Sequence, residues 1–417
     1  MPDFLPYLLV LLAILGLLSV IFEEVTHINK AQSVLFFGTI SWVLLFIFSP
    51  DKEFHDKVLE GLEHNISEIA TLWLFLVATM TFVVYLNKKG LVTNVTYRLL
   101  PKHISERSLL VLTGIFCFVF SSVVDNITAT LVVTALILSL GMSTAKMLRF
   151  AAVTVFGINS GGVAMITGDV TTLMIFLAGK VTIVDLLILA VPALAAVLLL
   201  AFMLARPLNG QLVIERKSTP FEKVDVMIAL TFLSTIALTL VGNMFFSIPP
   251  VLTFLTGLSI MFLIAKALGE DTEHEPILSY VRQIEFDTLL FFLGILLIVG
   301  SLKEINALST FSALYNHMPA WAANYLFGLL SAFIDNVPLT AALLKANIDM
   351  SVQEWMGLTY AVGVGGSLLI IGSAAGIVAM SKIKGLTFAS YGRFVIWLLI
   401  AYTAGYAAVL GFANLLL

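Results

Sequence analysis

The sequence predicts an all-helical protein that crosses a membrane many times and is built as two inverted repeats. Hydrophobic residues make up 60% of its 417 positions and charged residues 12%, against about 45–50% and roughly 25% in soluble domains. Since a spanning helix needs about 20 mainly apolar residues, a chain of this length can supply ten or more. The longest polar stretches, 50–68, 87–107 and 266–285, have the length of linkers. We therefore expect the chemistry to lie within the bilayer.

The composition also excludes several classes of protein. The net charge is −4 and no basic cluster extends beyond short helix flanks, so the electrostatic footprint of a nucleic-acid binder is missing. Cys117 is the single cysteine and cannot form an intrachain disulfide or a thiolate metal site. The six histidines show no metal-ligand spacing. We expect no cofactor other than the transported ions.

Uninterrupted apolar runs predict eight plain membrane helices. These runs are 4–22, 31–49, 69–86, 182–205, 224–244, 250–268, 288–301 and 390–415. Two further helices, 147–177 and 355–380, are interrupted by polar and glycine-rich residues. The interruptions are Asn159-Ser160-Gly161-Gly162 and the run 363–367, where we expect local unwinding.

Two more apolar segments each carry an Asp-Asn pair at the middle. Asp125-Asn126 lies within 108–140 and Asp335-Asn336 within 319–348. Each arm has about 15 residues, or roughly 23 Å at 1.5 Å per residue, which is short of the roughly 30 Å hydrocarbon core. Two re-entrant hairpins therefore fit better than four spans.

The hairpins and the broken helices are copies of each other. The segment 121–127 matches 331–337, and in each broken helix a glycine, Gly168 or Gly372, follows the glycine pair by six positions. This places a first repeat at 1–215 and a second at 216–417. Each half has five crossings, an odd number, so the second half is predicted to be inverted relative to the first.

Lysine and arginine test this topology independently. With the N-terminus outside, 17 of the 22 fall on one side, and only Lys52, Lys57, Lys180, Lys303 and Lys345 fall on the other. Because cytoplasmic loops are enriched in Lys and Arg, the first side is the cytoplasm and both termini face out. The hairpins then enter from opposite sides, and their Asp-Asn tips meet near mid-membrane.

Three aspartates, Asp125, Asp169 and Asp335, are predicted at bilayer depth, where a charged group indicates function. Ser121 and Ser331 each stand four residues before a hairpin aspartate, which on a helix puts hydroxyl and carboxylate on one face. Carboxylates, hydroxyls, amides and carbonyls are hard oxygen ligands that can replace water around Na⁺. We expect a sodium site with Asp125 and Asp335 as ligands.

Each motif also has a structural interpretation. Asn126 and Asn336 could cap the second arm of each hairpin. The run at Asn159 could be a kink that serves packing, and the polar stretch 167–172 could support the site without touching the ion. The Ser367 hydroxyl could bond back to the preceding turn.

The motifs resemble those of the NhaD-type sodium/proton antiporters of the ion transporter superfamily. The resemblance runs from about residue 71 to the C-terminus and rests on the segments 125–126, 159–162, 168–172, 335–338 and 365–374. It implies a bacterial inner-membrane antiporter with a two-hairpin fold, often dimeric, in which a transport domain slides past a scaffold. It places Ser121, Asp125, Asn126, Asn159, Asp169, Thr171, Thr172, Ser331, Asp335, Asn336 and Ser367 at the family's functional polar positions.

Two transport functions follow, and neither is enzymatic. The first is exchange of Na⁺, or Li⁺, for protons through carboxylates at the hairpin tips. The second is sodium-coupled transport of an organic anion or oxyanion. The dicarboxylate carriers of the same superfamily have Ser-Asn-Thr at these tips, so Asp-Asn favours cations. An intramembrane aspartyl protease is disfavoured, because Ile166 replaces the first glycine of the Gly-x-Gly-Asp signature.

Overall fold

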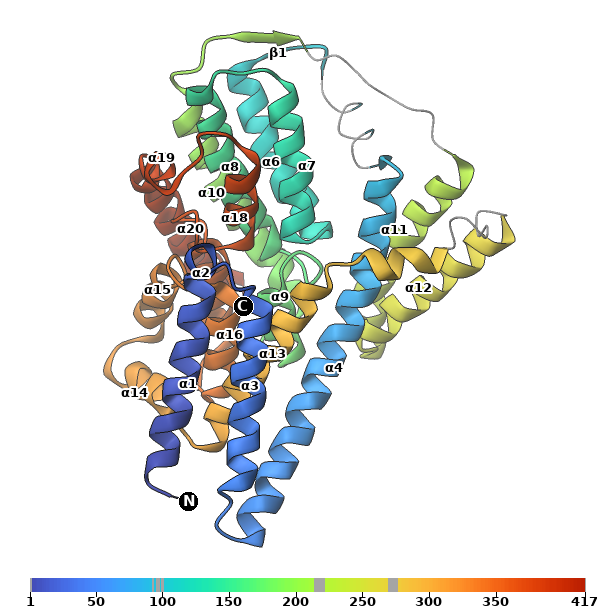
Figure 1. The fold of residues 1–417 in the computed structure, drawn as a ribbon. Coiled ribbons are helices and arrows are strands. Elements are labelled where there is room, and N and C mark those ends of the chain that lie inside the picture. Colours follow the sequence, from blue (N-terminus) through green and yellow to red (C-terminus); the bar gives the residue numbers. More distant parts are fainter. Residues whose placement is uncertain are drawn as a thin grey trace. The chain divides into compact units, whose positions relative to one another are not determined.

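The computed structural model describes residues 2–91, 94, 98, 101–213, 222–268 and 277–416. Within these ranges the chain is helical apart from one small sheet (Figure 1). Parts of the predicted linkers 87–107 and 266–285, and Arg216 and Lys217 of the charge count, lie outside the described residues.

Eight helices of the described chain are long and apolar enough to cross a membrane, which confirms the prediction of a polytopic membrane protein. They are α3 (Lys30–Ile47), α4 (Lys52–Lys88), α6 (Glu106–Val123), α10 (Ile183–Ala205), α11 (Lys223–Phe246), α12 (Pro250–Ala267), α13 (Phe286–Glu304) and α20 (Val395–Leu416). Shorter elements are α1 (Phe4–Ile21), α2 (Glu23–Thr26), the 3₁₀ helix η1 (Ile277–Gln283), α14 (Ser309–His317) and α19 (Phe388–Gly392).

The polar stretch 50–68 is not a linker, contrary to the sequence prediction. Residues 52–88 form one continuous helix, α4, of 37 residues. Its polar first part is amphipathic: Val58 and Asn65 are buried, whereas most residues between them are exposed. Burial of one stripe stabilises a helix even where the sequence is mainly polar.

Both predicted hairpins break at their Asp-Asn pairs. The first consists of α6 and α7 (Asn126–Ser139), and the second of α15 (Ala320–Leu330) and α16 (Asn336–Lys345). The expected arm length of about 15 residues is wrong for α6, which has 18 and is among the helices long enough to span. Re-entrant insertion of the hairpins therefore stays a prediction.

The first interrupted helix unwinds after its predicted interruption, 159–162, whereas the second unwinds from Gly366, inside its predicted run 363–367. The first comprises α8 (Thr144–Gly162) and α9 (Val170–Leu177), and the second α17 (Val352–Gly365) and α18 (Ala374–Lys382). The glycines serve close packing: a Cβ on Gly161 would lie 2.1 Å from the carbonyl oxygen of Phe118, and one on Gly365 would lie 2.0 Å from that of Gly328. The first break, 163–169, is therefore displaced by one or two turns from its predicted position, whereas the second, 366–373, overlaps its predicted position.

The chain packs into two compact units. The first contains residues 1–69, 110–208 and 287–417, and within it α7 packs on α8, α15 on α17 and α10 on α20. The second contains residues 70–109 and 209–286. In it the rings of Phe82 and Phe232 stack at 5.1 Å, and strands β1 (His103–Ser105) and β2 (Gln211–Val213) pair antiparallel. This division by packing does not test the division into repeats, which stays a prediction.

Candidate functional site

Asp169 is the centre of a buried hydrogen-bonded cluster in the first unit. It precedes α9 as its N-cap, and its Oδ1 accepts from the backbone N–H of Thr171 at 3.0 Å. Its Oδ2 accepts from Nδ2 of Asn126 at 3.0 Å and from Nδ2 of Asn336 at 3.1 Å. Ser121 extends the network, since its hydroxyl donates to Oδ1 of Asn126 at 2.7 Å. We call Ser121, Asn126, Asp169 and Asn336 the Asp169 cluster.

The cluster joins both Asp-Asn motifs to one carboxylate. Asn126 and Asn336 are the first residues of α7 and α16, 210 positions apart in the chain. Both amides donate to the same oxygen of Asp169, which is only 7% exposed. Asp335 is near enough for its charge to act on Asp169. The sequence-based expectation that parts of both hairpin tips meet agrees with this geometry.

The two hairpin aspartates cap helices. Asp125 accepts from the N–H of Thr128 at 2.9 Å, and Asp335 from the N–H of Val337 at 3.0 Å. The capping interpretation therefore describes the backbone correctly, although the caps are the aspartates rather than Asn126 and Asn336. Because each aspartate caps its helix, the following asparagine becomes the first helical residue. In this position its side-chain amide is directed toward Asp169.

Neither hairpin serine bonds its aspartate, which corrects the shared-face expectation. Ser121 bonds Asn126, whereas the Ser331 hydroxyl donates to the backbone carbonyl of Val362 at 2.8 Å. The reason is that α6 ends at Val123 and α15 at Leu330. The helical face that would join serine to aspartate does not extend across the break.

The remaining predicted residues surround the two helix breaks. Asn159 donates through Nδ2 to the hydroxyl of Ser373, the N-cap of α18, at 3.0 Å. The Thr172 hydroxyl donates to the carbonyl of Gly162 at 3.2 Å. The Ser367 hydroxyl bonds back to the carbonyl of Val364, as its structural interpretation expects. The side chains of Asn159 and Ser367 thus make these hydrogen bonds outside the Asp169 cluster.

Sequence reasoning missed two buried hydroxyls. Ser160 and Thr340 have no hydrogen-bond partner for their side-chain oxygens among the described residues, and the same holds for Oδ1 of Asn159 and Oγ1 of Thr171. Buried polar atoms are normally paired, so unpaired ones mark places where a ligand or water is accommodated. The repeat could have indicated Thr340 as a site residue, because a threonine follows each hairpin aspartate by five residues.

The electrostatics of the site favour a cation. No Lys, Arg or His side chain of the described residues forms a hydrogen bond with the Asp169 cluster. The described residues also hold no group of three or more His, Cys, Asp and Glu that could bind a metal. Asp169 is the one carboxylate of the Asp169 cluster, and the two amides and the hydroxyl of the cluster carry further hard oxygen atoms. This donor set fits a monovalent cation better than a divalent one.

Membrane-length helices around a buried carboxylate, with no hydrogen bond from a cationic side chain of the described residues, define the class: a polytopic membrane transporter. The family model described as "Citrate transporter" matches residues 4–363. The chain belongs to this family of transporters and is not an enzyme.

Several relatives carry more specific names. The "Na(+)/H(+) antiporter NhaD" of Alkalimonas amylolytica is 30% identical over 92% of this chain and 86% of its own length. The protein of the same name from Vibrio cholerae is 31% identical over 92% of this chain and 87% of its own length. "Sodium/proton antiporter 1" of Arabidopsis thaliana is 31% identical over 96% of this chain and 71% of its own length.

Proposed function

We propose that the protein exchanges Na⁺ for H⁺ across a bacterial inner membrane and that Asp169 carries both ions in turn. The names of its relatives support the exchange of these two ions. The observation that carries the role of Asp169 is the pair of amides, one from each Asp-Asn motif, on a single buried carboxylate oxygen. No other aspartate of the described chain receives side-chain bonds from both hairpins.

The mechanism follows from the two ends of a side-chain amide. The N–H groups of Asn126 and Asn336 satisfy the Asp169 carboxylate. A half-turn of the Asn336 amide presents its oxygen instead of its nitrogen, while the Ser121 hydroxyl holds the Asn126 amide in place. The site can then surround Na⁺ with a carboxylate and neutral oxygens. A proton on Asp169 removes the charge that holds Na⁺, so the site carries one ion or the other. Alternating exposure of the site to the two sides then couples the opposing fluxes.

Two finer proposals rest on the same chemistry and on the resemblance. We propose that Li⁺ can replace Na⁺, because the ligands are hard oxygens that also suit the smaller ion. We also propose that the protein assembles as a homodimer, as the resemblance to the NhaD-type antiporters implies.

A sodium-coupled anion carrier is the second candidate, and the family model's description favours it. Helix N-termini at the breaks are the one feature an anion could use. However, the carboxylate of Asp169 already occupies the N-terminus of α9. Because no cationic side chain of the described residues is hydrogen-bonded to the Asp169 cluster to offset this charge, an anion at this position would be repelled.

The experiment compares one substitution at three aspartates. Everted vesicles that contain Asp169→Asn, Asp125→Asn or Asp335→Asn are tested for Na⁺-driven dequenching of a pH-sensitive dye. Asp169→Asn should abolish exchange, because it removes the shared ligand. The other two variants should keep measurable exchange, because asparagine is also an effective N-cap. Asp335→Asn should weaken apparent Na⁺ affinity more than Asp125→Asn does, since Asp335 acts electrostatically on Asp169.

Extraction of each variant as a monodisperse protein provides the control for folding. Wild-type exchange in folded Asp169→Asn would eliminate Asp169 as the carrier. Complete loss in folded Asp125→Asn or Asp335→Asn would transfer that role to the hairpin aspartate. Uptake of a labelled dicarboxylate by wild-type vesicles, with no dye response to Na⁺, would favour the anion carrier.

A further inference from the structure

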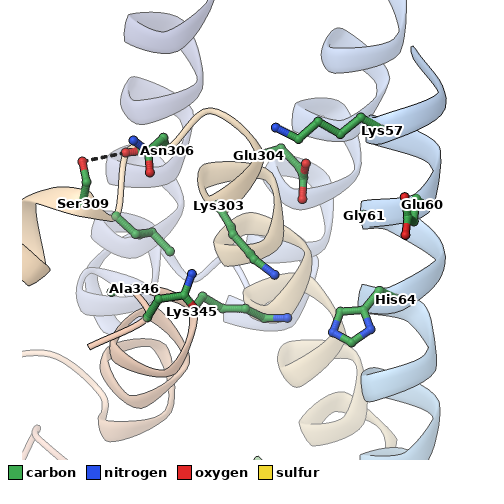
Figure 2. Close-up of a pocket in the computed structure, with 12 residues that line it drawn as sticks. Lys57, Glu60, Gly61, His64, Lys303, Glu304, Asn306, Ser309, Lys345 and Ala346 are labelled. Carbon is green, nitrogen blue, oxygen red and sulfur yellow. Dashed lines mark hydrogen bonds between the residues drawn. The ribbon is translucent and has the colours of Figure 1, made fainter. Parts of the chain in front are cut away.

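A second polar site lies in the first unit, away from the Asp169 cluster. It is a pocket of about 370 Å³ between the first part of α4, the C-terminal end of α13 and the C-terminal end of α16 (Figure 2). Its charged lining residues are Lys57, Glu60, His64, Lys303, Glu304 and Lys345. None of its lining residues belongs to the Asp169 cluster. Three of them are among the five lysines that the topology prediction puts on the lysine-poor side.

The positive groups converge at one end of this pocket. In Figure 2 the amino groups of Lys303 and Lys345 point into the same space, which His64 faces from α4. Lys57 and Glu304 lie toward the other end in this view. Two ammonium groups aimed at one space repel each other unless an anion lies between or beside them. The converging end therefore favours a negatively charged occupant.

The carboxylate of Glu68 is an anion that already contacts two of these groups, His64 and Lys345. One of its carboxylate oxygens lies 3.0 Å from Nε2 of His64, and the other pairs with Nζ of Lys345. The side chain of Lys345 is 10% exposed and that of Glu68 is 43% exposed, so this ion pair is partly open to water. Lys303 is half-buried, and its ammonium group has no ion pair or hydrogen bond to the residues that the structure describes. Its charge is available to a second anion.

We propose that this pocket binds a phosphate group, with Lys303 as the principal contact and Lys345 and His64 beside it. A tetrahedral oxyanion with several acceptor oxygens can bridge groups that come from three helices, whereas the Glu68 carboxylate reaches only two of them. The Lys residues also make the pocket unsuitable as a path for Na⁺. The site is therefore separate from transport and does not depend on the proposed function.

A phosphate group can come from free inorganic phosphate or from the headgroup of an anionic phospholipid. Basic pockets between membrane helices bind such headgroups. Both sources would place phosphate oxygens against the ammonium group of Lys303. Only the phospholipid would add contacts from an acyl chain.

The test measures thermal unfolding of the full-length protein purified in detergent. One arm adds inorganic phosphate at constant ionic strength set with KCl, so that general screening does not change. The other arm adds phosphatidylglycerol, with phosphatidylcholine as the neutral control. The same titrations are run on Lys303→Gln and on Lys52→Gln, an exposed lysine on α4 outside the pocket.

Phosphate or phosphatidylglycerol should raise the unfolding temperature of the wild type and of Lys52→Gln in a saturable way. Lys303→Gln should need about tenfold more of the same ligand, the effect of losing one charged hydrogen bond. A response to the lipid alone identifies the headgroup as the source, and a response to inorganic phosphate alone identifies the free anion. No response to either ligand, or equal responses in Lys303→Gln and the wild type, would overturn the proposal. If Lys303→Gln does not fold, Lys345→Gln, which removes another of the proposed contacts, takes its place.

Discussion

Ser121 and Ser331 occupy equivalent positions in the two Asp-Asn motifs and have different partners. The Ser121 hydroxyl donates to Asn126, which holds Asp169, whereas the Ser331 hydroxyl donates to a backbone carbonyl of α17. Each is fully buried. Ser121 therefore orients the amide that donates to Asp169, whereas Ser331 joins two helices.

We predict that Ser121→Ala weakens apparent Na⁺ affinity and that Ser331→Ala does not. Loss of the Ser121 bond frees the Asn126 amide to leave its orientation on Asp169, at a cost of about 1 kcal/mol, or roughly fivefold in affinity. Ser331→Ala should lower thermal stability by a similar free energy and leave affinity unchanged. The measurement is half-saturating Na⁺ in the dye assay for both variants. Equal affinities in the two would contradict the asymmetry.

All four members of the Asp169 cluster were predictable from sequence, but their arrangement was not. An aspartate at bilayer depth indicates function because a charge there is costly, and this argument applies equally to Asp125, Asp169 and Asp335. All three are N-caps, so capping does not separate them. Only Asp169 also receives side-chain amides from both hairpins. These contacts depend on where each helix begins, and sequence patterns do not fix helix ends that closely.

At the scale of the elements, close crossings of hairpin arms and broken helices hold the site in place. Gly161 of α8 meets Phe118 of α6, and Gly365 of α17 meets Gly328 of α15. Phe118 and Gly328 are equivalent positions of the two hairpins, each seven residues before its aspartate. The same contact thus occurs twice, which supports the proposed repeat. It requires a residue without a side chain in the broken helix.

We predict that Gly365→Ala severely reduces the amount of folded protein. The added Cβ would lie 2.0 Å from a backbone oxygen that cannot swing aside, so α15 and α17 must separate. Overpacking typically costs 1–3 kcal/mol, and a clash with backbone is at the upper end. The matched control is Gly411→Ala on α20, where an added Cβ meets nothing within 4 Å. The measurement is the yield of monodisperse protein in detergent. Equal yields of the two variants would show that α15 and α17 have room for a side chain at position 365.

The sequence predicted most elements because apolar runs and Asp-Asn breaks are strong signals. It failed at α4, where the polar stretch 50–68 continues the helix, since the stripe containing Val58 and Asn65 is recognisable only when its packing partners are known. It also placed the unwinding of α8 at the glycines. A glycine predicts either a break or a close approach, and only the contact between Gly161 and Phe118 decides between them.

At the scale of the whole molecule, the distribution of 17 Lys and Arg residues against 5 predicts the orientation in the membrane. A reporter that is active only in the cytoplasm should give a signal when fused after residue 217 and none when fused after residue 417. The amount of each fusion in the membrane is the control. A strong signal from the fusion after residue 417 would contradict both the topology and the inverted repeat that requires it.

The central claim is that Na⁺ and H⁺ compete for the carboxylate of Asp169. A protonated carboxyl is neutral and does not hold Na⁺, so a fall in pH should raise the half-saturating Na⁺ concentration, approaching tenfold per pH unit for one competing proton. Saturating Na⁺ should then largely restore the maximum rate. The most direct test measures half-saturating Na⁺ at several pH values with the wild-type protein in proteoliposomes. A steep rise toward acidic pH with a nearly constant maximum rate is the predicted result, and an affinity independent of pH with a falling maximum rate would contradict the claim.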